Sequence, residues 1–379
     1  MSNLKGLNGI HVVTTSSERK AFLRFTYQHY KGVECFVPPL LIDQKKMIDT
    51  KKNPFYQHAD IELYIAERDG DTIGRIAAID NRAYNEYHGT KTGFFGFFEC
   101  IEDKEVASLL FRVAKDWLRN RGLKTVIGPT NPGLMDVIGI LVDGFDRLPV
   151  LLYPYNYPYY DSLIKSCGFE QEVDMYNYWV EDKGVDLERL NRGKKIIEKR
   201  YPTFNLRTVN MKEIKKEGEQ IRQIFNASWA DNWGFVPITK PEFKNLIDDL
   251  KLIVDPDFNY MVEVDNKTVG FSIALPDWNR ALRYLKNGRL LPTGIFKLLY
   301  HKNKIDRLRT ALMGVLPEYR KAGFDAMMHR QSTIGCLKSD RYNGSEIGWI
   351  LETNTEMIRV AEKVNGKRKQ TYRMYRSAL

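Results

Sequence analysis

The stretch from Leu308 to Lys338 constrains the fold most, because an apolar run ends there in a basic loop and continues into a helix-forming segment. This order predicts a strand, a tight loop around Arg320 and Lys321, and then the start of a helix. Backbone N–H groups at a helix N-terminus lack partners within the helix and carry the positive end of its dipole. Gly323 would let a ligand approach the backbone closely. The stretch therefore predicts a binding loop for an anion such as a diphosphate.

The segments around this loop give it a context. Upstream, strands are predicted over 260–264 and 268–275, joined by a hairpin turn. Downstream, a buried strand over 345–351 precedes an amphipathic helix and an alternating edge strand over 371–375. The motif Arg320-x-x-Gly323 alone would also fit an ordinary strand-to-helix turn, so the order of the elements has to decide between the two interpretations.

The spacing Arg320-x-x-Gly323 and the order of the elements resemble the acyl-CoA loop of the GNAT N-acyltransferase superfamily. That pattern has Gly or Ala two residues after the glycine, whereas this chain has Asp325, whose carboxylate would repel a diphosphate unless it points away. The resemblance implies an α/β (α+β) fold, with a mixed, mostly antiparallel twisted sheet flanked by helices. It also implies acetyl-CoA or a longer acyl-CoA as acyl donor, an amine as acceptor, and no metal.

The first half of the chain shows the same order of elements without the basic loop. Strands are predicted over 61–67 and 72–79 around a turn with Gly70, and a third strand over 93–98. The segment 99–104, at the place of the loop, is acidic, so a diphosphate would be repelled there. We therefore expect the first half to serve as scaffold or acceptor site rather than as a coenzyme site.

A chain of 379 residues exceeds what one hydrophobic core normally supports. We expect two tandem GNAT-like lobes, at 1–180 and 206–379, joined by a basic segment at 181–205. This segment is predicted to be a solvated connecting helix. The alternative is that it binds anionic lipid head groups or the adenosine phosphate of the coenzyme.

Three further strings are more specific than the loop. They cover 226–237, 275–279, and 128–132 followed by 141–146. Together they resemble a bacterial family of about this length with a GNAT-like domain. They are also similar to bacterial ceramide synthases, which attach a long acyl chain to the amine of a sphingoid base. This resemblance implies a lipid amine of the sphingoid type as the acceptor.

The resemblance assigns roles to single residues. Asp277 or Glu352 would be the base that frees the amine lone pair, and Tyr372 would protonate the departing thiolate. A backbone N–H of the strand before the loop would hold the oxyanion. The residues expected to bind the coenzyme are Gly314, Val315, Leu316, Arg320, Lys321, Ala322, Gly323 and Asn354. The residues expected to contact the acceptor are Asn232, Trp233 and Asn279.

Each of these residues also has a plain structural interpretation. Trp233 and its neighbours could close the core as a rim of aromatic side chains. Asp277 and Asn279 suit an ordinary turn, and Asn354 is a better helix cap than Glu352. A chain with 21 tyrosines also contains many that only pack. A pair of degenerate GNAT-like lobes that binds a ligand or a protein without catalysis is therefore the alternative function.

Composition narrows the class of partner. The chain has 58 Lys and Arg against 48 Asp and Glu, a net charge of +10, which favours anionic partners. We find no nucleic-acid-binding motif and expect no nucleic acid as a partner. The cysteines stand far apart and the six histidines have no ligand spacing, so we expect reduced thiols and no metal. No signal peptide is expected in the first residues and no membrane span elsewhere, which predicts a cytoplasmic protein, at most peripheral at the inner membrane face.

The segment between Asn279 and Asp306 is longer than the short connection expected there. Leucines alternate with basic residues, in helical segments split by Pro292-Thr293-Gly294. The plain interpretation is a cover packed on the protein's own sheet. The functional one is a hydrophobic lid or a membrane-surface element for a long acyl chain or a lipid acceptor, in contact with an anionic membrane.

Overall fold

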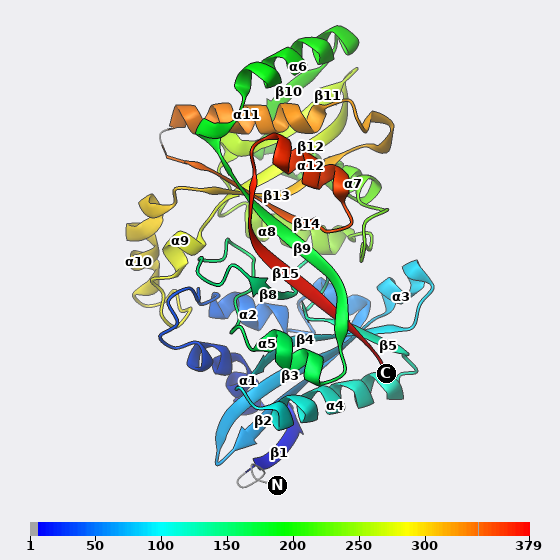
Figure 1. Cartoon of the computed structure of the whole chain (residues 1–379), viewed down its shortest axis with the longest axis vertical. Coiled ribbons are helices and arrows are strands. Elements are labelled where there is room, and N and C mark those ends of the chain that lie inside the picture. Colours follow the sequence, from blue (N-terminus) through cyan, green and yellow to red (C-terminus); the bar gives the residue numbers. More distant parts are fainter. Residues whose placement is uncertain (1–6, 340) are drawn as a thin grey trace. The chain divides into compact units, whose positions relative to one another are not determined.

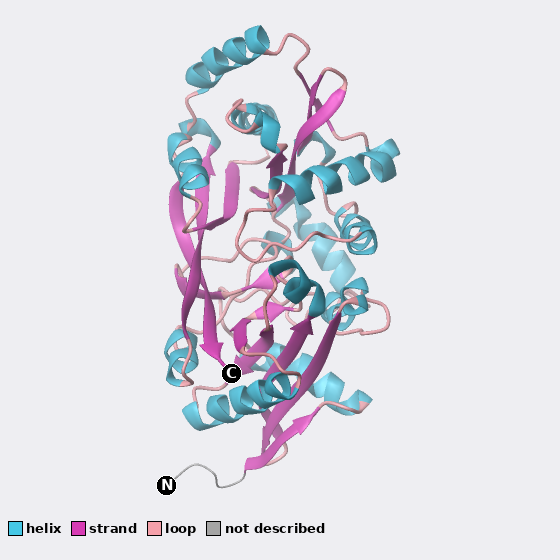
Figure 2. Ribbon diagram, turned by 90° about the vertical axis from the view of Figure 1, so that its right-hand side faces the viewer, coloured by secondary structure: helices cyan, strands magenta, loops and turns pink. Residues whose placement is uncertain are grey.

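The computed structural model describes residues 7–339 and 341–379, which form two compact units (Figures 1 and 2). Unit 1 contains the described residues up to Asp174, together with Ala281–Tyr300 and Gln370–Leu379. Unit 2 contains Met175–Arg280 and the described part of His301–Lys369. The units thus divide the chain differently from the predicted lobes 1–180 and 206–379, because two segments of the second half pack with the first.

The sheet of unit 1 follows the predicted order. Its strands, in spatial order, are β1 (Leu7–Val12), β2 (Ala59–Arg68), β3 (Asp71–Asn81), β4 (Thr92–Cys100), β5 (Thr125–Gly128) and β15 (Lys367–Ala378), and β8 (Ile140–Asp143) also pairs with β15. Strands β2 to β4 are antiparallel, whereas β4 and β5 are parallel. The β2–β3 turn forms as predicted, with Asp69 and Gly70 both at positive φ.

Helices of unit 1 are α1 (Ser16–His29), α2 (Leu41–Met47), α3 (Arg82–His88), α4 (Lys104–Asn120) and α5 (Tyr160–Ser166), and α10 (Gly294–His301) extends to the boundary of unit 1. Short two-residue strands β6 (Thr130–Asn131) and β7 (Val137–Ile138) pair with each other. Helix α4 places Leu110, Phe111 and Leu118 in a core with Phe95 and Phe98 of β4. This apolar stripe is the reason that residues 104–120 form a helix packed on the sheet.

The sheet of unit 2 has the spatial order β9 (Glu170–Glu181), β14 (Gly344–Leu351), β13 (Leu308–Val315), β12 (Lys267–Pro276), β11 (Asn259–Val264) and β10 (Asn205–Thr208), with β9 beginning in unit 1. The remaining helices are α6 (Leu187–Arg200), α7 (Ile214–Ser228), α8 (Lys240–Leu250), α9 (Asn279–Leu282), α11 (Phe324–Ser339) and α12 (Thr355–Lys363). Met261 of β11 packs with α7 and α8, whereas its neighbours Tyr260 and Val262 pack with α6 and α11. Because side chains of a strand alternate between faces, these two helix pairs cover opposite faces of the sheet.

Two predictions about elements need correction. The strand over 371–375 is not an edge strand, because β15 pairs with both β5 and β8, and Tyr372, Met374 and Tyr375 are all fully buried. The basic segment 181–205 contains the expected helix, α6, but this helix is more than a connection. Its Ile197 is buried in the core that α11 forms with β11 and β12.

Candidate active site

The parallel strands β13 and β14 of unit 2 separate along their length. They pair at Leu308↔Ser345, Arg309↔Glu346 and Thr310↔Ile347. Beyond these pairs, β13 continues with β12 and β14 continues with β9. Toward the carboxyl ends, the facing edges of the two strands therefore have backbone N–H and C=O groups that do not bond to the other strand. Such groups need other partners when they are covered.

Strand β13 carries a bulge at the point where it leaves β14. Its partners on β12 change from Ile273↔Leu312 to Ala274↔Thr310, so Ala311 is the extra residue. A bulge bends a strand and changes the direction of its backbone groups, and bulges are common next to active sites. Two residues further, the carbonyl of Met313 accepts a hydrogen bond from the Trp229 indole at 2.9 Å. The segment after α7 is thereby fixed against β13.

The predicted strand, loop and helix around Arg320 form in this order. β13 ends at Val315, a single 3₁₀ turn covers Pro317–Tyr319, and α11 begins at Phe324. Lys321 and Gly323 have φ values of 64° and 85°, and a Cβ on Gly323 would lie 3.2 Å from Ile197 Cδ1. Among the described residues no hydrogen bond is recorded for the backbone N–H groups of Lys321, Gly323 and Phe324. The loop therefore offers free donors beside two basic side chains, as an anion site requires.

The segment after α7 reaches the loop. Arg320 donates to a carboxylate oxygen of Asp231 at 3.1 Å and to the carbonyl of Ser228 at 3.2 Å. Asn232 and Trp233 follow in the same turn, in which the Asn232 N–H donates to the Trp229 carbonyl at 2.9 Å. The structure thus brings the predicted acceptor residues Asn232 and Trp233 to the side of the predicted coenzyme loop. Both are half-buried, and their contact with an acceptor stays a prediction.

The other predicted coenzyme residues lie on β13 and around the loop. Gly314 is buried, and a Cβ there would overlap the Ser228 hydroxyl, so glycine allows β13 to lie against the end of α7. Val315, Leu316 and Ala322 pack against the core around Phe324. Their role in binding a coenzyme stays a prediction.

Asp325, the departure from the superfamily pattern, lies in the first turn of α11. A carboxylate there is favourable for the helix dipole. It also interacts with His329 one turn later: burial lowers the pKa of His329, and Asp325 raises it. Asp325 therefore has a structural role that does not depend on a bound anion.

A buried polar cluster lies at the paired ends of β13 and β14. The Arg307 guanidinium donates to the Asp277 carboxylate at 2.7 Å and to that of Glu346 at 3.4 Å. Asp277 is fully buried and Glu346 is 1% exposed. Burial alone would lower the pKa of Arg307, but Asp277 and Glu346 raise it. Sequence reasoning missed Arg307 and Glu346, although a charged residue inside an apolar strand such as 345–351 is itself a signal of a paired group.

The register places the two predicted bases at opposite ends of the sheet. Asp277 follows β12, whose end pairs with the start of β13, and Asn279 donates its N–H to Asp277 at 3.2 Å. Glu352 follows β14, which runs parallel to β13, so this half-buried residue lies toward the end that carries the Arg320 loop. The eight residues of β13 span about 26 Å. Asp277 and Glu352 are therefore alternatives and not a pair.

Asn354 and Tyr372 have clear structural roles. Asn354 caps α12, because its side-chain oxygen accepts from the Met357 N–H at 3.1 Å, as its position predicted. Tyr372 belongs to unit 1, pairs with Leu141 of β8, and has its ring 5.1 Å from that of Tyr153. Coenzyme binding by Asn354 and proton transfer by Tyr372 stay predictions.

In unit 1, the protein itself fills the space that corresponds to the opening between β13 and β14. Strands β4 and β5 also pair over three positions and then separate. A Cβ on Gly96 of β4 would overlap the carbonyl oxygen of Thr130, and the Phe97 N–H donates to the Asn131 side chain at 2.5 Å. The start of α4 is capped by Asp103, which accepts from the N–H groups of Glu105 and Val106. These contacts support the expectation that the first half has no coenzyme site.

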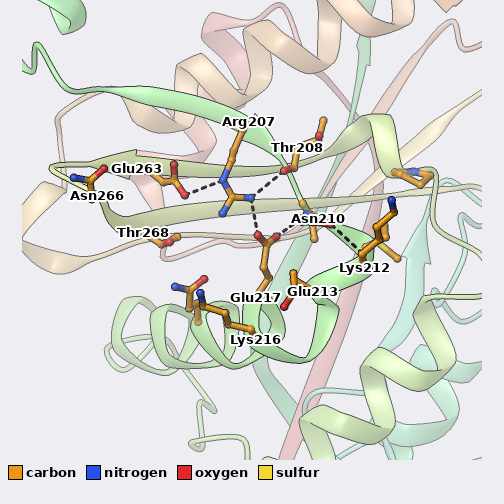
Figure 3. Close-up of a pocket in the computed structure, with 14 residues that line it drawn as sticks. Arg207, Thr208, Asn210, Lys212, Glu213, Lys216, Glu217, Glu263, Asn266 and Thr268 are labelled. Atoms are coloured by element: carbon orange, nitrogen blue, oxygen red, sulfur yellow. Dashed lines mark hydrogen bonds and ion pairs between the residues drawn. The ribbon is translucent and has the colours of Figure 1, made fainter.

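A large cavity lies elsewhere in unit 2. It has a volume of about 840 Å³ and lies between β10, β11 and the start of α7 (Figure 3). Arg207 bridges Glu217 and Glu263 there, each at 2.8 Å. Because both neighbours are carboxylates, the guanidinium is already neutralised, and none of the predicted site residues lines this cavity. We therefore place the candidate site at the separation of β13 and β14.

No group of His, Cys, Asp or Glu side chains in 7–339 and 341–379 is arranged to hold a metal ion. In the same part of the chain, none of the helices has the length and apolar character needed to cross a membrane. The four cysteines, Cys35, Cys100, Cys167 and Cys336, are free thiols.

Solved structures with a similar fold are GNAT proteins. A tandem GNAT protein from the clavulanic acid biosynthesis pathway superposes with a TM-score of 0.57 at 9% identity, covering 97% of this chain and 98% of that one. A GCN5-related glucosamine N-acetyltransferase region of a fungal multi-domain GH3 beta-N-acetylglucosaminidase gives 0.58 at 12% identity, covering 97% and 38%. These likenesses confirm the predicted fold of tandem GNAT-like lobes.

Relatives by sequence cover nearly the whole chain, although no family model matches it. Protein YghO of Escherichia coli (strain K12) is 31% identical over 382 residues, which cover 99% of this chain and 97% of the relative. The bacterial ceramide synthase of Caulobacter vibrioides (strain NA1000 / CB15N) is 32% identical over 375 residues, covering 97% and 96%. Identity at this level over full length shows that the chain belongs to the two-lobe GNAT-like family of Protein YghO and bacterial ceramide synthase.

Proposed function

We propose that this protein is an acyl-CoA-dependent N-acyltransferase that moves an acyl group from a coenzyme A thioester to an amine. The observation that carries the proposal is the contrast between two helix starts. The start of α11 has free backbone donors beside Arg320 and Lys321, whereas the start of α4 is capped by Asp103. Among the described residues, the loop of unit 2 is therefore the better candidate for an anion site next to separated parallel strands.

The donor would be acetyl-CoA or a longer acyl-CoA. The free N–H groups of the loop fit its diphosphate, and Arg320 would have to exchange its exposed pair with Asp231 for a phosphate oxygen. An exposed pair of this kind contributes little, so the exchange costs little. The backbone of Gly314, Val315 and Leu316 would lie along the pantetheine, with Ala322 and Asn354 close to the loop.

The reaction needs a base, a polarised carbonyl and a proton for the leaving group. The amine nitrogen attacks the thioester carbonyl carbon, the C–S bond breaks, the base takes a proton from nitrogen, and the thiolate receives a proton. We propose Asp277 or Glu352 as the base and Tyr372 as the proton donor. A backbone N–H beside the bulge at Ala311 would stabilise the oxyanion.

The acceptor would be a lipid amine of the sphingoid type, and the acyl group a long one. Support comes from the full-length similarity to the bacterial ceramide synthase of Caulobacter vibrioides. Such an acceptor is taken from a membrane, so we propose a cytoplasmic protein with peripheral contact to the inner membrane face. The free cysteines are compatible with a reducing compartment.

One observation favours a second function, a degenerate pair of lobes that binds a ligand or protein without catalysis. Asp325 stands where the superfamily has Gly or Ala, within a turn of the free donors. A carboxylate at this place weakens anion binding unless the dipole and the basic side chains outweigh it.

Calorimetric titration with coenzyme A, acetyl-CoA and palmitoyl-CoA tests the proposal. We expect binding that is lost in Arg320→Ala and kept in Arg112→Ala, a matched change of an exposed arginine on α4. Tighter binding of palmitoyl-CoA than of acetyl-CoA would support a long acyl group. No binding of any of the three would favour the non-catalytic function. If palmitoyl-CoA binds, release of free coenzyme A on addition of a sphingoid base would test acyl transfer.

A further inference from the structure

Residues 281–300, between β12 and β13 in the sequence but part of unit 1, have two different halves. In the first half Ala281, Leu282 and Leu285 are buried. Gly288 is held against the segment before α2, because its carbonyl accepts from the Leu41 N–H at 2.8 Å and a Cβ on it would overlap Pro39. This half is a cover on the protein's own core, as the plain interpretation predicted.

The second half exposes its apolar side chains. Leu291 is 76% exposed, Phe296 69%, Leu299 51% and Tyr300 78%. Among the described residues, these are four of the twelve large apolar side chains that are exposed, and they fall within ten positions. Exposed apolar side chains that are scattered singly need no explanation, but a cluster of this kind marks an interaction surface.

Three of these side chains share one face of α10. Phe296, Leu299 and Tyr300 stand at i, i+3 and i+4, which brings them together on a helix surface. Ile295 and Leu298 are half-buried. The apolar face of a helix is normally covered by other parts of a protein or by a partner. Leu291 lies just before the helix, and we call Leu291, Phe296, Leu299 and Tyr300 together the apolar face of α10.

The charged residues of this segment have one sign. Residues 281–300 contain Arg283, Lys286, Arg289 and Lys297, and no Asp or Glu. No ion pair is recorded within 7–339 and 341–379 for Lys286, Arg289 or Lys297, and all three are exposed. Exposed basic residues beside exposed apolar ones are the composition of helices that lie in the interface of an anionic membrane.

We infer that the apolar face of α10 and the basic residues Lys286, Arg289 and Lys297 dock this protein on an anionic lipid surface. The apolar side chains enter the region between head groups and acyl chains, and the basic residues contact the head groups. A second protein copy would not be attracted to the same patch, because two such patches carry the same charge. The inference deepens the proposed function, since a lipid acceptor would be reached from that surface, but vesicle binding can be measured without acyl transfer.

The first test is flotation with vesicles of pure phosphatidylcholine and with vesicles that contain 30% phosphatidylglycerol, a composition on the order of that needed for a clear negative surface potential. We expect flotation with the anionic vesicles, weakened by salt, and much less with the neutral ones. Equal flotation with both would overturn the role of the basic residues. Flotation with neither would overturn the inference.

Matched variants locate the surface. Phe296→Ser with Leu299→Ser should lower the partition coefficient about tenfold, whereas Leu252→Ser, which removes a 77% exposed leucine in unit 2, should not change it. Lys297→Glu should lower it at least fivefold, whereas Lys91→Glu, an exposed lysine elsewhere in unit 1, should have little effect. All these side chains are exposed, so folding should be kept, as unchanged melting would show. Equal loss with the control variants would overturn the inference.

Two further results keep this inference separate from the proposed function. Coenzyme A binding by Phe296→Ser should equal that of the parent, because the loop around Arg320 belongs to unit 2. If the protein floats but binds no coenzyme A, the docking surface stands and the acyl transfer falls. If light scattering shows a dimer that Phe296→Ser dissociates, and vesicles are not bound, the apolar face of α10 is an interface between two copies and the inference is wrong.

Discussion

Units 1 and 2 contain the same arrangement of parallel strands and following helix, but they use it in opposite ways. In unit 1 the separation of β4 and β5 is filled by Thr130 and Asn131, and Asp103 satisfies the first N–H groups of α4. Both β4 and β13 carry a bulge where the parallel strands separate, but in unit 2 the start of α11 keeps free donors. The difference therefore lies in the acidic cap of α4 and in the contacts of Thr130 and Asn131, which have no counterpart at the start of α11.

One carboxylate cluster of each unit differs as well. Glu99 in unit 1 accepts from the hydroxyls of Tyr30 and Tyr160 at 2.5 and 2.7 Å, and burial raises its pKa, although the nearby Arg75 lowers it. In unit 2, two carboxylates share Arg307. Glu99 is thus held mainly by hydroxyl groups, whereas Asp277 and Glu346 share one guanidinium.

The largest expected effect comes from removing that guanidinium. Arg307→Met removes the guanidinium that bonds to the two buried carboxylates, Asp277 and Glu346, and should lower the free energy of unfolding by about 3–5 kcal/mol. Arg320→Met, which breaks an exposed pair, should change it by less than about 1 kcal/mol. Urea unfolding of both variants measures these two losses of stability. A similar small loss in both would show that water reaches the Arg307 cluster.

The next effect is on turnover. If unit 2 alone performs the chemistry, either Asp277→Asn or Glu352→Gln should lower kcat about a hundredfold or more, since a general base contributes this much. Glu102→Gln, in the acidic segment of unit 1, should leave kcat unchanged. Both unit 2 variants within severalfold of the parent would show that neither carboxylate is the base. Melting must be compared, because Asp277 is also part of the buried cluster.

A smaller effect is expected at the loop glycine. Gly323→Ala places a Cβ at φ 85° and 3.2 Å from Ile197, which should cost about 1–2 kcal/mol and weaken coenzyme A binding about tenfold. Gly122→Ala, after α4, has a similar φ of 77° with open space around it. It should lose similar stability without any change in binding. Calorimetry would contradict the comparison if both variants bound coenzyme A equally.

The smallest effect is the loss of the α4 cap. Asp103→Ala should cost about 1 kcal/mol. Burial alone would raise the pKa of Asp103, but Arg68 and the N–H groups of α4 lower it below its ordinary value. The cap therefore stabilises above the unfolded pKa of about 3.9, and this stability is lost as pH falls through the lower folded pKa. Urea unfolding at pH 7 and pH 3 should show the difference between variant and parent shrinking.

Asp103→Ala should not create coenzyme binding in unit 1, because the separation of β4 and β5 stays filled. If Asp103→Ala bound a second coenzyme A molecule and this binding survived Arg320→Ala, the proposed difference between the two units would be wrong.

Local features of the fold could be predicted from the sequence. The turn at Asp69 and Gly70, the strand, loop and helix around Arg320, and the cap at Asn354 depend on residues within a few positions of each other. The tandem GNAT-like fold was predicted because the order of these elements resembles that superfamily.

Contacts between distant residues could not be predicted in the same way. Arg307 meets Asp277 and Glu346 across 30 and 39 positions, and no periodicity in the chain gives this pairing. The filled separation in unit 1 depends on Gly96 meeting Thr130, which only strand register decides. Residues 281–300 were expected within the second lobe, but their buried leucines pack in unit 1.

The path of the chain has a consequence for any attempt to isolate a lobe from a shortened gene. The polypeptide passes from one unit to the other after Asp174, Arg280, Tyr300 and Lys369, twice within a strand. No single cut therefore yields either unit whole. A fragment beginning at 206 would lack the part of β9 that pairs with β14, and a protease that cuts near 290 would leave both units spread over two pieces. Each unit is therefore complete only in the uncut chain.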